Sequence, residues 1–174
     1  MTSRLFVALW PDGPARQALT ATLQSARPAA PDVRWQSPDR WHVTLAFLGS
    51  ADPDRAASRI EAVMERDHPL TEPLRLLGAG TFGPVIWIGV EHGTWLDQLA
   101  RGLQRALRVA DHRFRAHVTV GRIRGPNAPA RARRVAPHLA AHSGPPWTPA
   151  QITLVESVTG PAPSYTVRRS WPLP

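Results

Sequence analysis

The sequence contains no cysteine and no lysine. The lack of cysteine excludes disulfides, thiolate zinc sites and cysteine nucleophiles. No apolar run approaches the roughly 20 residues that cross a bilayer. The first apolar segment ends at Pro11 and Asp12 without the small-residue cleavage site of a signal peptide. A Gly-rich phosphate loop is also missing, so ATP use is not indicated. We expect a cytoplasmic protein that does not associate with membranes.

All 21 basic residues are arginines, and against 13 acidic residues they give a net charge of +8. Two interpretations of this excess stay open. Arginine offers a planar fork that matches phosphate, which favours a polyanionic partner. Alternatively, the abundance of Arg, Ala, Pro and Gly reflects a GC-rich genome. The charge is therefore compatible with a nucleic-acid substrate but does not establish one.

The composition is that of a globular protein, with 43% hydrophobic residues and seven tryptophans in 174 residues. Strand-like and helix-like patterns alternate without a long linker, which predicts an α+β architecture over residues 1–174. We expect strands over 4–10, 33–36, 42–48, 74–77, 85–90, 117–123, 152–158 and 165–169. We expect helices over 12–27, 52–66, 94–107 and 130–141, with Asp12 as a possible cap of the first. Residues 78–84, 126–129 and 144–149 are expected to be loops, and 160–163 to close a hairpin.

One tetrad occurs twice, as His42-Val43-Thr44-Leu45 and as His117-Val118-Thr119-Val120. The two histidines are 75 residues apart, and each begins a predicted strand. This repeat indicates an internal duplication with two similar lobes related by a pseudo-two-fold axis.

The spacing within each tetrad has a chemical consequence. Side chains alternate along a strand, so His and Thr project from one face while the intervening apolar residues enter the core. Two imidazoles that meet across a pocket supply a general base and a general acid near neutrality. Threonine hydroxyls can hydrogen-bond the non-bridging oxygens of a phosphate. A single His-x-Thr on a strand is usually an ordinary structural pair, whereas two matched copies favour catalysis.

The chain resembles the two-histidine (2H) phosphoesterases, especially the RNA 2′,3′-cyclic phosphodiesterases, also called 2′–5′ RNA ligases. The similarity lies in stretches that follow the family's order along nearly the whole chain. They are residues 4–9 (RLFVAL), 33–35 (VRW), 42–49 (HVTLAFLG), 82–90 (FGPVIWIGV), 114–120 (FRAHVTV), 154–157 (LVES), Tyr165 and 171–173 (WPL).

The resemblance implies a bilobal α+β fold with a pseudo-two-fold axis, in which two antiparallel sheets line a central cleft and helices lie outside. It implies that His42 protonates the leaving 3′ oxygen and that His117 activates water. It also implies that Thr44 and Thr119 hold the phosphate and that Arg122 helps to bind the substrate. Strict alternation turns Arg122 away from His117, so this role needs a twist or bulge in the strand.

The implied reaction is hydrolysis of an RNA 2′,3′-cyclic phosphate end to a 2′-phosphate, with reversible 2′–5′ ligation as a related activity. It needs no metal or other cofactor, and we expect a monomer. Two alternatives stay open: a 2H enzyme acting on a small cyclic nucleotide or an ADP-ribose cyclic phosphate, and a non-catalytic RNA-binding module. The sequence departs from the family at Ala116, where proline is usual, and at Gly121, where alanine is frequent.

Several other residues are given structural interpretations. His138 and His142 have the spacing of a metal pair on a helix, but we expect both on the surface. The isolated His68, His92 and His112 are also expected to be exposed. The arginines at 122, 124, 131, 133 and 134 either track an RNA backbone or form a solvated helix face, and we favour the second. Trp41 and Phe47 have the chemistry to stack a base, but alternation places Phe47 on the inner side.

Overall fold

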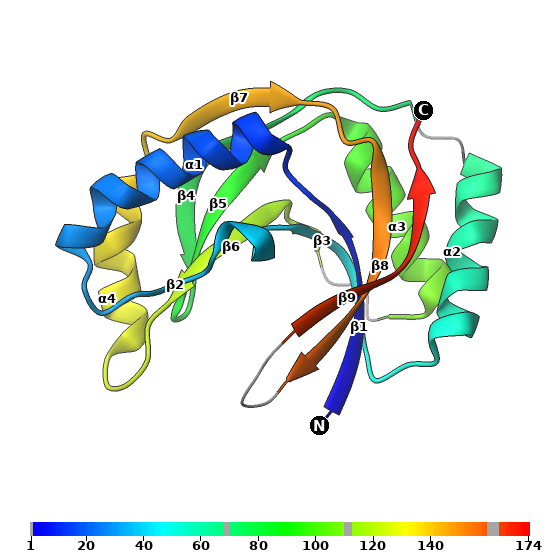
Figure 1. Ribbon diagram of the computed structural model, residues 1–174, viewed down its shortest axis with the longest axis horizontal. Helices are drawn as coiled ribbons and strands as arrows, with labels where there is room; N and C mark the ends of the chain where they lie inside the picture. Colours follow the sequence, from blue (N-terminus) through cyan, green and yellow to red (C-terminus); the bar gives the residue numbers. More distant parts are fainter. Residues whose placement is uncertain (1, 68–69, 110–112, 160–163) are drawn as a thin grey trace.

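A computed structural model describes residues 2–67, 70–109, 113–159 and 164–174. These residues form nine strands and four α-helices (Figure 1). The strands are β1 (Thr2–Leu9), β2 (Arg34–Trp35), β3 (Val43–Gly49), β4 (Leu74–Phe82), β5 (Val85–Glu91), β6 (His117–Arg122), β7 (Ser143–Trp147), β8 (Gln151–Thr159) and β9 (Ser164–Pro172). The helices are α1 (Gly13–Ala26), α2 (Pro53–Asp67), α3 (Thr94–Leu107) and α4 (Ala128–Val135).

The strands make one curved antiparallel sheet in the order β7-β4-β5-β6-β3-β1-β8-β9, and β2 adds to β6. The predicted α+β class is confirmed, but the expectation of two separate sheets is wrong. The two halves are joined because β3 and β6 pair through Val43 and Val118. Beyond that pair β3 diverges from β6, and β2 continues the pairing opposite Gly121 and Arg122.

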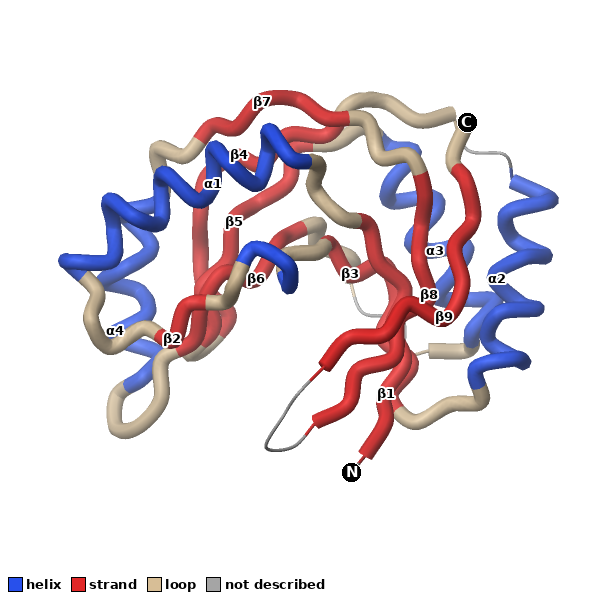
Figure 2. The backbone as a smooth tube through the Cα atoms, in the orientation of Figure 1, coloured by secondary structure: helices blue, strands red, loops and turns tan. Residues whose placement is uncertain are grey.

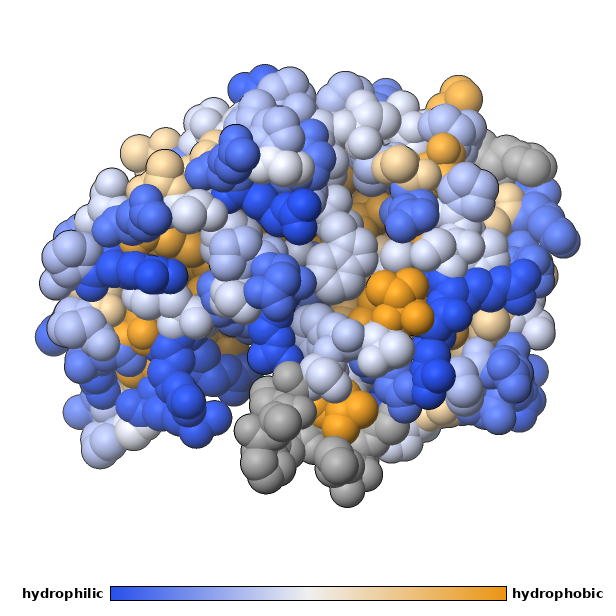
Figure 3. All heavy atoms as spheres, viewed as in Figure 1, coloured by the Kyte–Doolittle hydropathy of each residue, from blue (hydrophilic) through white to orange (hydrophobic). Residues whose placement is uncertain are grey.

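In Figure 2, α2 and α3 lie at one end of the curved sheet and α4 at the other, while α1 runs across the half that contains β4. Helices α1 and α4 pack on the half that contains β4, while α3 packs on β3 and α2 packs on α3 and β9. Helix α1 therefore follows β1 in the chain but covers the opposite half of the sheet. On the face in Figure 3, apolar residues surface only as separate areas among hydrophilic ones.

Local sequence signals account for most helix boundaries. Asp12 caps α1, since its Oδ1 accepts a hydrogen bond from the Ala15 amide at 2.8 Å. Helix α3 occupies the predicted residues 94–107 and buries its apolar stripe. It ends at Arg108, whose φ of 57° is left-handed. Glycine is the residue that usually occupies this position.

Two predicted loops are strands. Residues 78–82 extend β4, and Gly83, with a φ of 54°, turns the chain into β5. Residues 143–147 form β7, which pairs with β4 despite Pro145 and Pro146. Strand β7 lies at the edge of the sheet, where a missing amide donor is tolerated.

Three predictions for the C-terminal part of the chain are partly confirmed. The expected loop 126–129 is cut short because α4 begins at Ala128, and the expected helix 130–141 changes to a 3₁₀ turn after Val135. Strands β8 and β9 pair as the hairpin prediction requires, while residues 160–163 lie outside the described residues. None of the described helices has the length and apolar character needed to span a membrane.

Candidate active site

The two tetrads of the repeat meet at the centre of the sheet. Val43 pairs with Val118, which follows it by the same 75 residues that separate the two histidines. Each valine is thus paired with its own counterpart in the repeat, so a local two-fold axis passes between them. Both valines are fully buried. The flanking histidines and threonines project from the other face, where antiparallel pairing sets Thr44 beside His117 and His42 beside Thr119. We call these four residues the two-histidine site.

A backbone hydrogen bond and three aromatic rings hold the imidazole of His42 in place. Its Nδ1 lies 2.8 Å from the carbonyl oxygen of Arg40. A carbonyl only accepts, so Nδ1 carries the hydrogen and Nε2 is left for chemistry. The ring stacks on Phe6, with centroids 4.7 Å apart, and lies near Trp10 and Tyr165 at 5.3 and 5.6 Å.

His117 has the same arrangement on the other side of the axis. Its Nδ1 lies 2.7 Å from the carbonyl oxygen of Arg115, which again leaves Nε2 free to exchange a proton. Phe82 meets the ring edge-on at 5.0 Å and Trp87 lies at 6.2 Å. Within the described residues neither histidine uses Nε2 in a hydrogen bond.

Arg40 and Arg115 belong to the same repeated design, which sequence reasoning missed. Each lies two residues before its histidine and supplies the carbonyl that fixes the tautomer. The guanidinium of Arg40 lies over Tyr165 at 4.7 Å, and that of Arg115 over Trp87 at 4.5 Å. The signal was present, because the repeat extends by two residues to Arg-x-His-Val-Thr in both copies.

The electrostatics of the site favour neutral imidazoles. The pKa of His42 is lowered from 6.5 to about 4, mainly by burial and with smaller contributions from the charges of His117 and Arg40, against the raising effect of the Arg40 carbonyl. Burial also lowers the pKa of His117; the hydrogen bond to the Arg115 carbonyl raises it, and the charge of Arg115 makes a smaller lowering contribution. The pairing of Val43 with Val118 places the two histidines on neighbouring strands at this site.

The chain is 34% identical over 136 residues to the RNA 2′,3′-cyclic phosphodiesterase of Archaeoglobus fulgidus. This match covers 71% of this chain and 74% of that protein. It is 32% identical over 133 residues to the protein of the same name from Geobacillus stearothermophilus. This match covers 69% of this chain and 42% of that protein. The chain thus spans less than half the length of the latter. The family model described as LigT-like phosphoesterase matches residues 9–87.

The chain belongs to the LigT-like phosphoesterases. The crystal structure of Escherichia coli LigT in its apo form has the same fold, with a TM-score of 0.77, 22% identity and coverage of 99% of this chain and 98% of that one. The predicted family is therefore confirmed, and the matched residues 9–87 include the first of the two tetrads.

A β-bulge decides where Arg122 lies in this LigT-like site. The β5–β6 register shifts between Ile86 and Trp87, so Thr119 pairs with Trp87 while Arg122 pairs with Val85. Because Val85 and Trp87 are two residues apart on one face, the bulge returns Arg122 to the face of Thr119 and His117. The condition that the sequence set for this residue is thus met, and the side chain of Arg122 is exposed.

The departure from the family at Gly121 has a packing reason. A Cβ atom at this position would lie 2.6 Å from Cγ1 of Val33 and 3.2 Å from Cε3 of Trp35, because β2 approaches β6 here. Glycine therefore allows β2 to pack beside the bulge. Ala116, the other departure, is buried directly before His117.

The prediction that Phe47 faces inward is wrong. The β1–β3 register shifts between Val7 and Ala8, where Leu45 adds a residue, so Phe47 pairs with Phe6 on the face that carries His42. Phe47 is 54% exposed, whereas Trp41 is buried. Phe47 follows Thr44 by three residues, as Arg122 follows Thr119, so equivalent bulges present a phenylalanine in one half and an arginine in the other.

The prediction of a surface position is also wrong for His142, and the predicted full exposure of His92 is not observed. The side chain of His142 is buried, its Nδ1 lies 2.8 Å from Oγ1 of Thr22 on α1, and burial lowers its pKa. His138 is exposed as predicted, and His92 is partly buried. His68 and His112 lie outside the described residues. Across the ranges described, no three histidine, aspartate or glutamate side chains gather into a metal site.

The basic stretch after β6 is placed mainly on an exposed helix face. Arg133 and Arg134 are exposed on α4, and Arg131 forms an ion pair with Asp32. This placement agrees with the interpretation of these arginines as a solvated face.

Proposed function

We propose that this LigT-like phosphoesterase hydrolyses RNA 2′,3′-cyclic phosphate ends to 2′-phosphates with two histidines and no metal. The observation that carries the proposal is the equivalent fixation of both rings. Each Nδ1 is committed to a backbone carbonyl, and each Nε2 remains available on the same face of the sheet. The curated relatives carry the name RNA 2′,3′-cyclic phosphodiesterase.

In the proposed reaction His117 accepts a proton at Nε2 from the attacking water. The water oxygen bonds to phosphorus, and the bond between phosphorus and the 3′ oxygen breaks. His42 donates the proton on its Nε2 to the departing 3′ oxygen. The phosphate stays on the 2′ oxygen, and the two histidines end with their protonation states exchanged.

The hydroxyls of Thr44 and Thr119 are assigned to the non-bridging phosphate oxygens. Each threonine lies beside the histidine of the other tetrad, so a phosphate between the rings meets one hydroxyl from each strand. Arg122, on the same face, adds a positive charge for the developing negative charge.

The proposed acid role of His42 requires the substrate to change its protonation. The unliganded site holds the pKa of His42 at about 4, so the ring is neutral at pH 7. A phosphate anion placed against the ring favours the charged imidazolium and raises the pKa of His42. The donor is thus charged when the substrate arrives.

Incubation with an oligonucleotide that ends in a 2′,3′-cyclic phosphate tests this function, with the phosphate position in the product identified by ³¹P NMR. We expect a 2′-phosphate, formed at the same rate in EDTA. A 3′-phosphate product, or a rate abolished by the chelator, contradicts the mechanism. Binding without turnover that is unaffected by His42→Ala supports a non-catalytic RNA-binding module instead.

A further inference from the structure

The exposed side chain of Phe47 lies between the two-histidine site and an arginine-lined hollow. On the near side, Phe47 and Val109 line a hollow of about 280 Å³ together with Thr44, Arg115 and His117. On the far side, Phe47 and Val109 line a second hollow of about 550 Å³ that includes Arg55, Arg59 and Arg108. The two hollows adjoin at these two residues, and we call them together the Phe47 groove.

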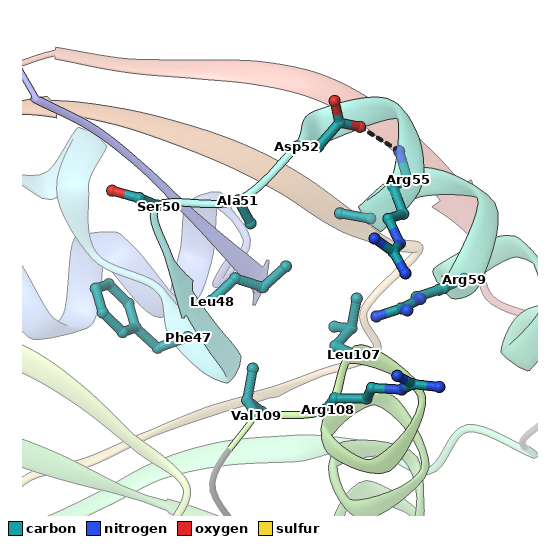
Figure 4. A pocket seen from close by; sticks show the side chains of 11 residues that line it. Phe47, Leu48, Ser50, Ala51, Asp52, Arg55, Arg59, Leu107, Arg108 and Val109 are labelled. Carbon is teal, nitrogen blue, oxygen red and sulfur yellow. Dashed lines mark hydrogen bonds between the residues drawn. The ribbon is translucent and has the colours of Figure 1, made fainter.

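The far end of the Phe47 groove is strongly positive. Three arginines and one carboxylate, that of Asp52, line it. Oδ1 of Asp52 accepts a hydrogen bond from the Arg55 amide at 2.7 Å, so this carboxylate serves as a helix cap. In Figure 4 the three arginine side chains gather beyond Leu107, on the side of the hollow away from Phe47.

The three arginines have no ion-pair partner among the residues that the structure describes, whereas other arginines, such as Arg66 and Arg131, do. Arg108 also occupies a left-handed backbone position at the end of α3, where glycine is the favoured residue. Arg108 thus places a large cationic side chain at a backbone conformation that favours glycine. Unpaired guanidinium groups beside an exposed aromatic ring suit a phosphate backbone and a base.

We propose that the Phe47 groove binds the RNA chain on the 5′ side of the cyclic phosphate. A base stacks on Phe47, and Arg55, Arg59 and Arg108 neutralise backbone phosphates. The inference rests on the proposed function, because a 2′,3′-cyclic phosphate closes the 3′ end and the chain continues only through the 5′ oxygen. The groove makes an oligonucleotide, and not a mononucleotide, the preferred substrate.

A third hollow, outside the Phe47 groove, also lies beside the two-histidine site, but its charges suit an RNA chain less well. It is lined by Phe82 and Trp87 and also by Glu91 and Asp97, which balance Arg113 and Arg115. Carboxylates repel a phosphate backbone, so a polyanion gains little there. The net positive charge of the Phe47 groove favours that path.

The test compares a mononucleotide 2′,3′-cyclic phosphate with a five-nucleotide RNA that ends in the same group. For the RNA, the triple variant Arg55→Gln/Arg59→Gln/Arg108→Gly is expected to lower kcat/KM by about 10- to 100-fold at low salt, and Phe47→Ala by roughly 5- to 100-fold. Hydrolysis of the mononucleotide by the triple variant is expected to change less than about two-fold. The slope of log kcat/KM against log salt for RNA should fall by about 2 in the triple variant, from three lost phosphate contacts.

The matched control is Arg101→Gln, which removes one charge from an exposed position on α3 outside the groove. It should leave both substrates unaffected. Glycine at position 108 suits the left-handed backbone, so the triple variant is expected to keep the melting temperature of the wild type. Equal effects on both substrates, or no effect on the RNA, would overturn the proposal.

A binding measurement separates this inference from the proposed function. Fluorescence anisotropy with a labelled five-nucleotide RNA that ends in a 2′-phosphate needs no turnover. If the wild type hydrolyses neither substrate, the proposed function fails, and the groove is still decided by this assay. Weaker RNA binding by the triple variant, with Arg101→Gln unchanged, supports the groove, and equal binding by all three proteins rejects it.

Discussion

Val43 and Val118 are paired across β3 and β6, and each is the counterpart of the other in the sequence repeat. This pair joins the two halves of the sheet and sets the symmetry of the site on its other face. The histidines, the carbonyls that orient them, the threonines and the two bulges all follow the same offset of 75 residues. The site is therefore built from one structural unit used twice, and the aromatic rings around each histidine differ between the copies.

Loss of either histidine should slow hydrolysis of the cyclic phosphate by about two to four orders of magnitude, because each transfers one proton in the transition state. The rates of the two variants are expected to differ on a phosphodiester with a nitrophenolate leaving group, because this group departs without a proton. His42→Ala should then regain most of the wild-type rate, while His117→Ala stays slow. Steady-state kinetics on both substrates measure the difference, and the reverse pattern would exchange the two roles.

Acid should destabilise the fold through His42. Its pKa is about 4 in the native state and about 6.5 when unfolded, so between these values the unfolded chain binds a proton that the native protein does not. The free energy of unfolding is expected to fall by up to about 3 kcal/mol as the pH drops from 6.5 to 4. Urea unfolding of the wild type and His42→Gln at several pH values measures this contribution. The same pH dependence in both proteins would contradict it.

Arg115 is a positioning residue whose charge acts on His117. Its positive charge lowers the pKa of this histidine, so Arg115→Gln is expected to raise that pKa and Arg115→Lys to restore it. The backbone carbonyl that binds Nδ1 remains in both variants. NMR titration of the His117 ring follows the effect directly, and it should shrink at high salt. A change in stability without a change in this titration would reduce Arg115 to a packing role.

Gly121→Ala should destabilise the bulge that presents Arg122. The new Cβ would meet Val33 at 2.6 Å, so β2 must move away from β6. We expect a loss of about 1–3 kcal/mol, as for overpacking in a core. Gly13→Ala is the matched control, since nothing lies within 4 Å of its Cβ position. Chemical denaturation of both variants tests the difference, and equal stability would show that β2 adjusts without strain.

The sequence predicted the parts of this protein that follow a local period. The apolar stripe of α3, the cap at Asp12 and the two tetrads were all readable, because each depends on neighbours a few residues away. The burial of His142 was not readable, since it depends on the packing of α1 against the opposite half of the sheet. The same long-range contact between halves, the pairing of Val43 with Val118, turned two expected sheets into one.

Strict alternation of side chains along a strand could not predict which face of the sheet carries Phe47 and Arg122. A bulge adds one residue to a strand and reverses the face of every residue that follows it. Nothing in the sequence around Leu45 marks such a bulge, and Gly121 marks the other only once β2 is seen to pack against it. The prolines at 145 and 146 likewise predicted a loop, because the sequence does not show that β7 lies at the edge of the sheet, where proline is tolerated.

The central claim is that two imidazoles present Nε2 to a single phosphate. The most direct measurement is ¹⁵N NMR of the imidazole nitrogens of His42 and His117 during titration with a 2′-nucleotide, at a fixed pH near 6. We expect both Nε2 signals to move together with one dissociation constant and both rings to gain protonation. A response confined to one histidine, or two different dissociation constants, would contradict the account.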